Sequence, residues 1–83
     1  MRTVVYGPEA RKSLRQMPRN VAELMRGKLN QLASDPETLA NNLSALKGTS
    51  ALRLRIGDWR VILSIEPERI IVHQIGPRGS IYR

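Results

Sequence analysis

Five residues in the C-terminal half of the sequence have side chains suited to chemistry on a phosphate group. They are four arginines and one tyrosine: Arg53, Arg55, Arg60, Arg78 and Tyr82. A guanidinium forks onto two phosphate oxygens, and a phenol can donate or accept a proton. Guanidiniums that lie close together repel one another unless an anion sits between them. We therefore expect these residues to converge on a site for a bound anion.

The net charge of the chain points to the same class of ligand. Lys and Arg number 14, eleven of them arginine, against seven Asp and Glu, which leaves a net charge of +7. No acidic residue follows Glu68. Such an excess favours polyanions: RNA, DNA, the ribosome surface or an acidic protein. The alternative interpretation is a basic surface that serves only solubility.

Length and composition limit the classes of protein that the chain can be. Its 83 residues, 41% of them hydrophobic, suit one small domain that spans residues 1–83. The absence of cysteine excludes disulfides, thiolate metal sites and a cysteine nucleophile, and a single histidine argues against structural zinc. We expect neither a metal nor a cofactor. Short apolar runs and a polar N-terminus predict a cytoplasmic protein that does not enter a membrane.

The N-terminal part of the sequence predicts a strand followed by a pair of helices. Residues 3–6 are rich in β-branched side chains and predict a strand. Pro8 and Pro18 then suit the first turns of two helices, the second of which ends before Pro36. Apolar residues recur at helical spacing in both segments. The predicted inward faces are Ala10, Leu14 and Met17, and then Val21, Leu24, Met25, Leu29 and Leu32 with Lys28 at the edge.

Residues 38–50 show the weakest periodicity and indicate a connection between the second helix and the C-terminal strands. Leu39, Leu43 and Leu46 are compatible with one further helical turn or with a loop pinned to the core. Lys47 and Gly48 fit a helix C-cap, with the lysine as a cation near the helix end.

The C-terminal part of the sequence predicts a sheet. Residues 51–56 alternate between apolar side chains and arginine, Gly57 and Asp58 suit a hairpin turn, and residues 59–65 form the next strand. Residues 69–75 are apolar on both faces and predict a central strand. The order β-α-α-β-β-β predicts an α+β fold, in which the helical hairpin packs on one face of an antiparallel sheet. The other face is then available for a functional site.

This arrangement places the arginines on the free face of the sheet. Arg53 and Arg55 are two residues apart and share a face, about 6–7 Å apart along the strand. Arg60 reaches the same face across the hairpin. Two structural alternatives remain open. Arg53 and Arg55 can form only the solvent-exposed face of an amphipathic strand, and Arg60 can form a surface ion pair with Asp58 or Glu66.

Three aromatic or titratable residues also have structural interpretations. Tyr82 near the C-terminus can simply cap the core instead of acting in catalysis. His73 can be a base, but a packed or hydrogen-bonded histidine is the simpler interpretation of its place on a central strand. Trp59 is expected to anchor the core.

Three motifs, in this order and spacing, resemble the RelE/ParE superfamily of toxins over essentially the whole chain. They are LKG at residues 46–48, a basic strand that ends in GDWR at residues 57–60, and GPRGSIY at residues 76–82. The resemblance implies the toxin of a type II toxin–antitoxin module, with a RelE-like fold. RelE-like members cut mRNA in the ribosomal A site, whereas ParE-like members share the fold and poison DNA gyrase. The basic and phenolic residues at the matching positions favour the RelE-like branch.

For RelE-type catalysis, the resemblance assigns catalytic roles to Arg55, Arg60, Arg78 and Tyr82. It assigns contacts with RNA or the ribosome to Lys47, Arg53, Arg55, Arg60 and Arg83. Because the 2′-hydroxyl of RNA is the nucleophile, the reaction needs no metal. Arg53 and Arg55 stand where RelE-type enzymes often carry lysine, and arginine stabilises charge but does not act as a base. Pro77 stands where many relatives have a basic residue.

The resemblance also implies the partners of the chain and its alternative functions. We expect an acidic antitoxin that folds as it binds, and that either masks the arginine face or displaces the C-terminal segment. Operator DNA is then bound indirectly through that antitoxin. The ribosome and mRNA are the other expected partners. The alternatives are a ParE-like inhibitor of DNA gyrase without nuclease activity, and a non-toxic relative that only binds antitoxin.

Overall fold

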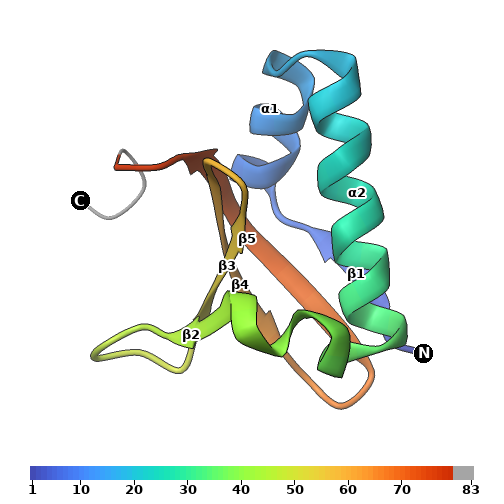
Figure 1. Cartoon of the computed structure of the whole chain (residues 1–83), viewed down its shortest axis with the longest axis vertical. Helices are drawn as coiled ribbons and strands as arrows, with labels where there is room; N and C mark the ends of the chain where they lie inside the picture. Colours follow the sequence, from blue (N-terminus) through green and yellow to red (C-terminus); the bar gives the residue numbers. More distant parts are fainter. Residues whose placement is uncertain (80–83) are drawn as a thin grey trace.

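Two prolines set the beginnings of the two helices. The computed structural model describes residues 1–79. In it, α1 (Pro8–Gln16) has Pro8 in its first turn, and Pro18 is the N-cap of α2 (Arg19–Ser34). The N–H of Asp35 donates to the Gln31 carbonyl at 2.8 Å, which closes the last turn of α2 just before Pro36. Both predicted helices are therefore confirmed, and they stand side by side against one face of the sheet (Figure 1).

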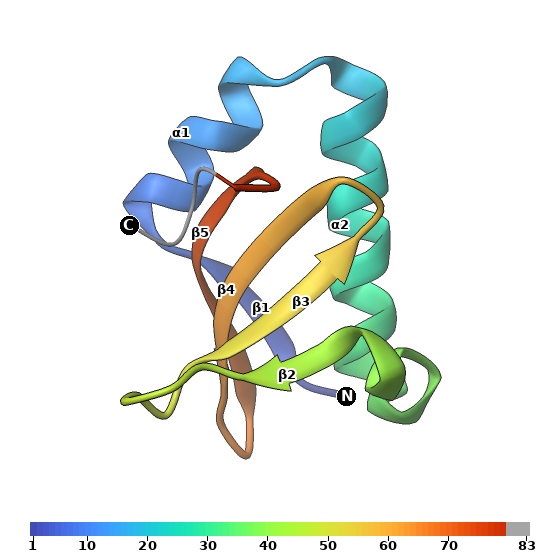
Figure 2. The same cartoon turned by 60° about the vertical axis from the view of Figure 1, so that its left-hand side comes forward.

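The sheet has five strands in the order β1-β5-β4-β3-β2. The strands are β1 (Thr3–Tyr6), β2 (Leu43–Ala45), β3 (Leu52–Ile56), β4 (Trp59–Ile65) and β5 (Arg69–Pro77). Neighbours from β2 to β5 are antiparallel, and β1 lies parallel to β5 (Figure 2). The α+β fold class and the central place of residues 69–75 are confirmed. The helical hairpin and η1 carry the chain from β1, at one edge of the sheet, to β2 at the other edge.

The segment after α2 contains the further helical turn that was one of the two predicted alternatives, and also a short strand that was not predicted. A 3-10 helix, η1 (Pro36–Asn42), is followed directly by the edge strand β2, which pairs with β3. Lys47 and Gly48 lie in the turn between β2 and β3, where Gly48 has a φ of 82°. The prediction of a helix C-cap at these two residues is therefore wrong. A glycine serves a tight hairpin connection here for the same reason that it serves a cap, because both need a positive φ.

The core lies between the helices and the sheet. Met25, Leu29 and Leu32 of α2 are fully buried against β-strand residues such as Leu54 and Leu63. The prediction that Leu24 faces inward is wrong, because 49% of its surface is exposed. Small residues complete the buried stripe of α2 instead: Ala22 and Ala33.

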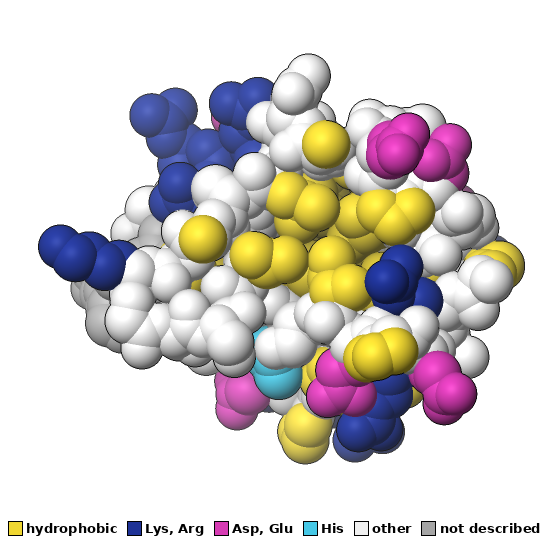
Figure 3. Space-filling view, turned by 90° about the horizontal axis from the view of Figure 1, so that it is seen from below, with side chains coloured by type: hydrophobic (Ala, Val, Ile, Leu, Met, Phe, Trp, Pro, Cys, Tyr) yellow, Lys and Arg dark blue, Asp and Glu magenta, His cyan; other side chains and the backbone are white. Residues whose placement is uncertain are grey.

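One end of the molecule, over η1, β2 and the turn after β4, combines apolar and charged surface. Hydrophobic side chains gather in the centre of this end (Figure 3). In this view most Lys and Arg side chains lie at the upper left and left, whereas Asp and Glu lie mostly at the upper right and along the lower rim. Within residues 1–79, no helix is long and apolar enough to cross a membrane.

Candidate phosphate-binding site

The alternation of β3 separates its apolar and basic side chains. Leu54 and Ile56 are buried under the helices, while Arg53 and Arg55 lie on the opposite face, which we call the open face of the sheet. Arg55 is the cross-strand partner of Arg60 in β4. Because directly opposed residues of antiparallel strands point to the same side, all three arginines belong to the open face. The prediction of a shared face is confirmed.

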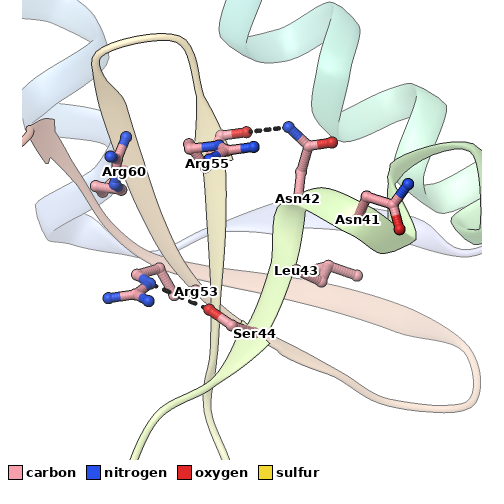
Figure 4. A pocket seen from close by; sticks show the side chains of 7 residues that line it. All are labelled: Asn41, Asn42, Leu43, Ser44, Arg53, Arg55 and Arg60. Atoms are coloured by element: carbon pink, nitrogen blue, oxygen red, sulfur yellow. Dashed lines mark hydrogen bonds between the residues drawn. The ribbon is translucent and has the colours of Figure 1, made fainter.

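The three arginines meet at a shallow pocket of about 210 Å³. Its other walls come from the end of η1 and the start of β2 (Figure 4). The complete described lining is Asn41, Asn42, Leu43, Ser44, Arg53, Arg55 and Arg60. It contains three guanidiniums, two amides and one hydroxyl, and within residues 1–79 no carboxylate reaches it. This set of donors suits an anion with several acceptor oxygens, such as a phosphate diester.

Hydrogen bonds hold the walls of this pocket in place. Arg53 donates from Nε to the Ser44 hydroxyl at 3.1 Å, and Asn42 donates from Nδ2 to the Arg55 carbonyl at 3.1 Å (Figure 4). Both bonds join β3 to the segment that was predicted only as a connection. The edge strand and η1 therefore act as a frame for the arginine strand.

Arg60 is fixed by backbone acceptors at the hairpin turn. Its Nη1 donates to the carbonyls of Gly57 and Trp59, at 3.0 Å in each case. The alternative, an ion pair of Arg60 with Asp58 or Glu66, does not form within residues 1–79. Glu66 instead binds Arg69 at 2.6 Å, and this contact raises the pKa of the Arg69 guanidinium. Carbonyl contacts orient Arg60 without neutralising it, so its charge remains for an external anion.

The remaining predicted site residues lie outside this pocket or outside the described chain. The backbone N–H of Arg78 donates to the Asp58 carbonyl at 2.7 Å, which holds the Arg78 backbone beside the β3–β4 turn. Arg60 follows Asp58 by two residues in the chain. Lys47 is exposed at the other end of β3, away from that turn. Tyr82 and Arg83 lie outside the described residues. The structure thus gathers Arg53, Arg55 and Arg60, and leaves Lys47 apart.

Sequence reasoning missed three polar residues of the pocket, namely Asn41, Asn42 and Ser44. They precede the basic strand by about ten residues and carry no motif, so only their pairing with β3 reveals them. The adjacent asparagines were the one available signal, and they also fit an ordinary turn.

His73 makes a hydrogen bond on the open face, in agreement with its structural interpretation. Its Nε2 lies 2.8 Å from the Ser64 hydroxyl. Trp59 packs against the core, as predicted. In the part of the chain that the structure describes, no group of His, Asp and Glu is arranged to hold a metal ion.

Comparison with known proteins agrees with the fold. The protein-family model described as the ParE toxin of the type II toxin–antitoxin system, parDE, matches residues 4–82. Archaeal RelE, from the RelE–RelB complex of Pyrococcus horikoshii OT3, is 25% identical with a TM-score of 0.78, over 95% of this chain and 97% of that one. No curated protein sequence matches.

Two bacterial toxins share the fold at lower identity. Escherichia coli RelE, in the intact RelBE toxin–antitoxin complex, is 18% identical with a TM-score of 0.74, over 95% of this chain and 99% of that one. E. coli YafQ, in the DinJ–YafQ toxin–antitoxin complex, is 13% identical with a TM-score of 0.70, over 99% of this chain and 98% of that one.

The family match covers residues 4–82, which is nearly the whole chain, and it identifies the chain as a toxin of a type II toxin–antitoxin system. The chain belongs to the RelE/ParE superfamily of such toxins.

Proposed function

We propose that this toxin is a ribosome-dependent mRNA endonuclease, an mRNA interferase, which inhibits translation and arrests growth. The observation that carries the proposal is the convergence of Arg53, Arg55 and Arg60 on one pocket whose described lining contains no carboxylate. Such a pocket binds a phosphate diester and stabilises the extra negative charge that develops when the phosphorus is attacked. Messenger RNA on the ribosome in the cytoplasm is the polyanion that RelE-like toxins use.

The reaction needs only the substrate's own 2′-hydroxyl and the residues of this chain. The 2′-oxygen attacks the adjacent phosphorus, and the bond from phosphorus to the 5′-oxygen breaks. In this proposal Tyr82 as phenolate accepts the 2′ proton, because a guanidinium beside a phenol favours its phenolate form. Arg55 and Arg60 hold the non-bridging oxygens. Arg78 either protonates the leaving 5′-oxygen or stabilises its charge while water supplies the proton. The products are a 2′,3′-cyclic phosphate and a 5′-hydroxyl.

The other basic residues serve binding in this proposal. Arg53 extends the arginine pocket along β3 and contacts the RNA backbone. Lys47 lies at the far end of the β2–β3 hairpin, so it suits a contact with the ribosome or with RNA away from the reacting phosphate. Arg83 is assigned to binding by the family resemblance alone.

A transcript-end assay tests the proposal. The toxin is induced, and 5′ ends are mapped on a translated mRNA and on an untranslated copy of the same message. We expect cuts only in the translated copy, with losses of at least about 100-fold in Arg60→Ala and Tyr82→Phe, since one group that stabilises the transition state contributes roughly this much. Arg11→Ala is the matched control, because it removes one charge from an exposed site on α1. Full cleavage by both site variants would overturn the proposal.

Inhibition of DNA gyrase is the second candidate function, and the match to the ParE toxin model favours it. In that case the open face binds a protein and performs no chemistry. Growth arrest with DNA-damage signalling, and with no cut in the translated message, would establish this function in place of the nuclease. No arrest and no cuts would identify a non-toxic relative.

The same surface suits an antitoxin partner. RelE of P. horikoshii and of E. coli are both seen in complexes with RelB. For this chain we propose an acidic antitoxin segment that folds as it covers Arg53, Arg55 and Arg60, and we propose that the complex meets operator DNA through the antitoxin. Charge reversal by Arg55→Glu should weaken the complex, while Arg11→Glu should not. If the side chains of these three arginines are fully exposed to solvent in the purified complex, the proposed masking is wrong.

A further inference from the structure

A second pocket lies on the open face, beside the arginine pocket. Its volume is about 580 Å³, within the range of sites that hold small organic groups. Its floor is the middle of the sheet, and its walls come from the β1–α1 junction and from the end of the β2–β3 hairpin. The described lining is Gly7, Pro8, Glu9, Leu46, Thr49, Ala51, Ile62, Ser64, His73 and Gln74.

A β-bulge supplies two adjacent polar side chains to this pocket. Ile62 pairs with Gln74 and Leu63 pairs with Val72, so His73 is an extra residue in β5. In a regular strand, His73 and Gln74 would point to opposite faces. The bulge instead leaves both exposed on the open face, while Val72 and Ile75 stay buried in the core. Bulges commonly re-aim side chains in this way next to functional sites.

The histidine ring is held in place. The 2.8 Å contact between His73 Nε2 and the Ser64 hydroxyl joins β5 to β4 across the bulge. Its Nδ1 atom and the amide of Gln74 remain to contact a ligand, since no hydrogen bond of either group to the described residues is formed. Ile62 provides an apolar surface between them and the arginines.

The charges of this pocket exclude phosphate as its occupant. Within residues 1–79, its lining has no lysine or arginine and includes one carboxylate, Glu9. It therefore differs from the arginine pocket, although one residue of each pocket, Arg53 and Ile62, are cross-strand partners. Arg53 is opposite Ile62, and Ile62 is opposite Gln74, so three neighbouring strands form one continuous path. Adjacent strands are about 4.8 Å apart, so the path spans about 10 Å, the scale of one nucleotide.

We infer that this second pocket holds a nucleobase of the RNA strand whose phosphate lies on the arginines, with adenine as the best fit. The inference rests on the proposed function. A base is flat, neutral and edged with donors and acceptors, and single-stranded RNA exposes those edges. Ile62 and the His73 ring contact the face of the base, and the Gln74 amide pairs with adenine N6 and N7, as glutamine does in nucleic-acid complexes.

Equilibrium binding of short single strands tests this inference. The probes are hexamers of 2′-deoxyadenylate, 2′-deoxycytidylate and 2′-deoxythymidylate, which cannot be cut through a 2′-hydroxyl, and an abasic hexamer of equal charge. We expect the adenine hexamer to bind about tenfold more tightly than the abasic strand, and more tightly than either pyrimidine hexamer. Gln74→Ala should remove the preference for adenine and leave abasic binding unchanged. Gln16→Ala, at an exposed position of α1, is the matched control.

The arms of this experiment separate the two claims. Arg55→Ala should weaken all four hexamers by a similar factor, because it removes a phosphate contact. Binding that depends on Arg55 but not on base identity or Gln74 would overturn the base pocket and leave the arginine site intact. Binding that does not depend on Arg55 would instead count against the proposed function. A pyrimidine preference that Gln74→Ala abolishes would overturn the adenine assignment.

Discussion

Arg55 and Arg60 are direct cross-strand partners, so two guanidiniums are opposed at one position of the β3–β4 ladder. Like charges in this relationship oppose folding. Arg60 is nevertheless anchored by two carbonyls, and the Arg55 backbone is held by Asn42. The neighbouring residues thus hold the two guanidiniums close together at a cost in the free energy of unfolding. Such a cost is expected where a surface is arranged to bind an anionic ligand.

Relief of this repulsion should stabilise the free toxin. We expect Arg55→Gln to raise the free energy of unfolding by about 0.2–1 kcal/mol, or the melting temperature by about 1–8 °C, while cleavage of translated mRNA is lost. Thermal unfolding followed by circular dichroism measures the first effect. Arg11→Gln lowers the net charge equally but should leave the melting temperature nearly unchanged. A drop in stability on Arg55→Gln would show that the two guanidiniums do not oppose folding.

Phosphate should stabilise the native state through the same pocket. At ten times its Kd, a ligand of the folded state alone adds about 1.4 kcal/mol to the free energy of unfolding. We expect phosphate to raise the melting temperature more than chloride does at equal ionic strength. In the Arg55→Gln, Arg60→Gln double variant, the difference between the two salts should disappear. If it persists there, the anion acts elsewhere or through the solvent.

Two glycines offer a matched test of how β1 and α1 are packed against β5. A Cβ atom at Gly7 would lie 3.2 Å from the Val72 carbonyl oxygen, which also accepts the Gly7 N–H at 2.8 Å. Gly7→Ala should therefore destabilise the fold by about 1–3 kcal/mol. At Gly27, in the exposed middle of α2, nothing lies within 4 Å of such an atom. Gly27→Ala should stabilise by about 0.5–1 kcal/mol. Urea denaturation measures the free energy of unfolding of both variants. Equal changes of the same sign would show that Gly7 is not packed closely against the Val72 carbonyl.

Ionisation of Tyr6 should lower the free energy of unfolding at alkaline pH. Burial raises the pKa of its phenol above the ordinary value of 10.0, and the charge of Arg26 lowers it by less. The folded state therefore favours the neutral phenol. This contribution to stability is fully present below about pH 10 and is lost as the pH rises through the folded-state pKa.

Tyr6→Phe should accordingly flatten the loss of stability above about pH 10. Urea denaturation between about pH 8 and pH 11 measures this effect, and ultraviolet absorbance reports phenolate formation. Tyr82→Phe serves as the second tyrosine variant. An unchanged alkaline slope in Tyr6→Phe would contradict the assignment.

The prediction of strands succeeded where the pattern was strictly periodic. Residues 51–56 alternate between apolar side chains and arginine, and only one register buries Leu54 while it places Arg53 and Arg55 on the open face. Both helices were also predicted correctly, but the set of residues that α2 buries was not. Leu24 was predicted to be buried because leucine is apolar, whereas the structure buries Ala22 and exposes Leu24.

The arginine strand, its hairpin turn and the basic character of the site were determined by the sequence, because alternation and charge are local properties of the chain. Only the tertiary structure decided which other residues complete the site. Ser44 and Asn42 reach the arginines through the pairing of β2, a strand too short to leave a periodic signal. His73 and Gln74 share a face because of a bulge, which is a mismatch between two strands and so has no signature in either one.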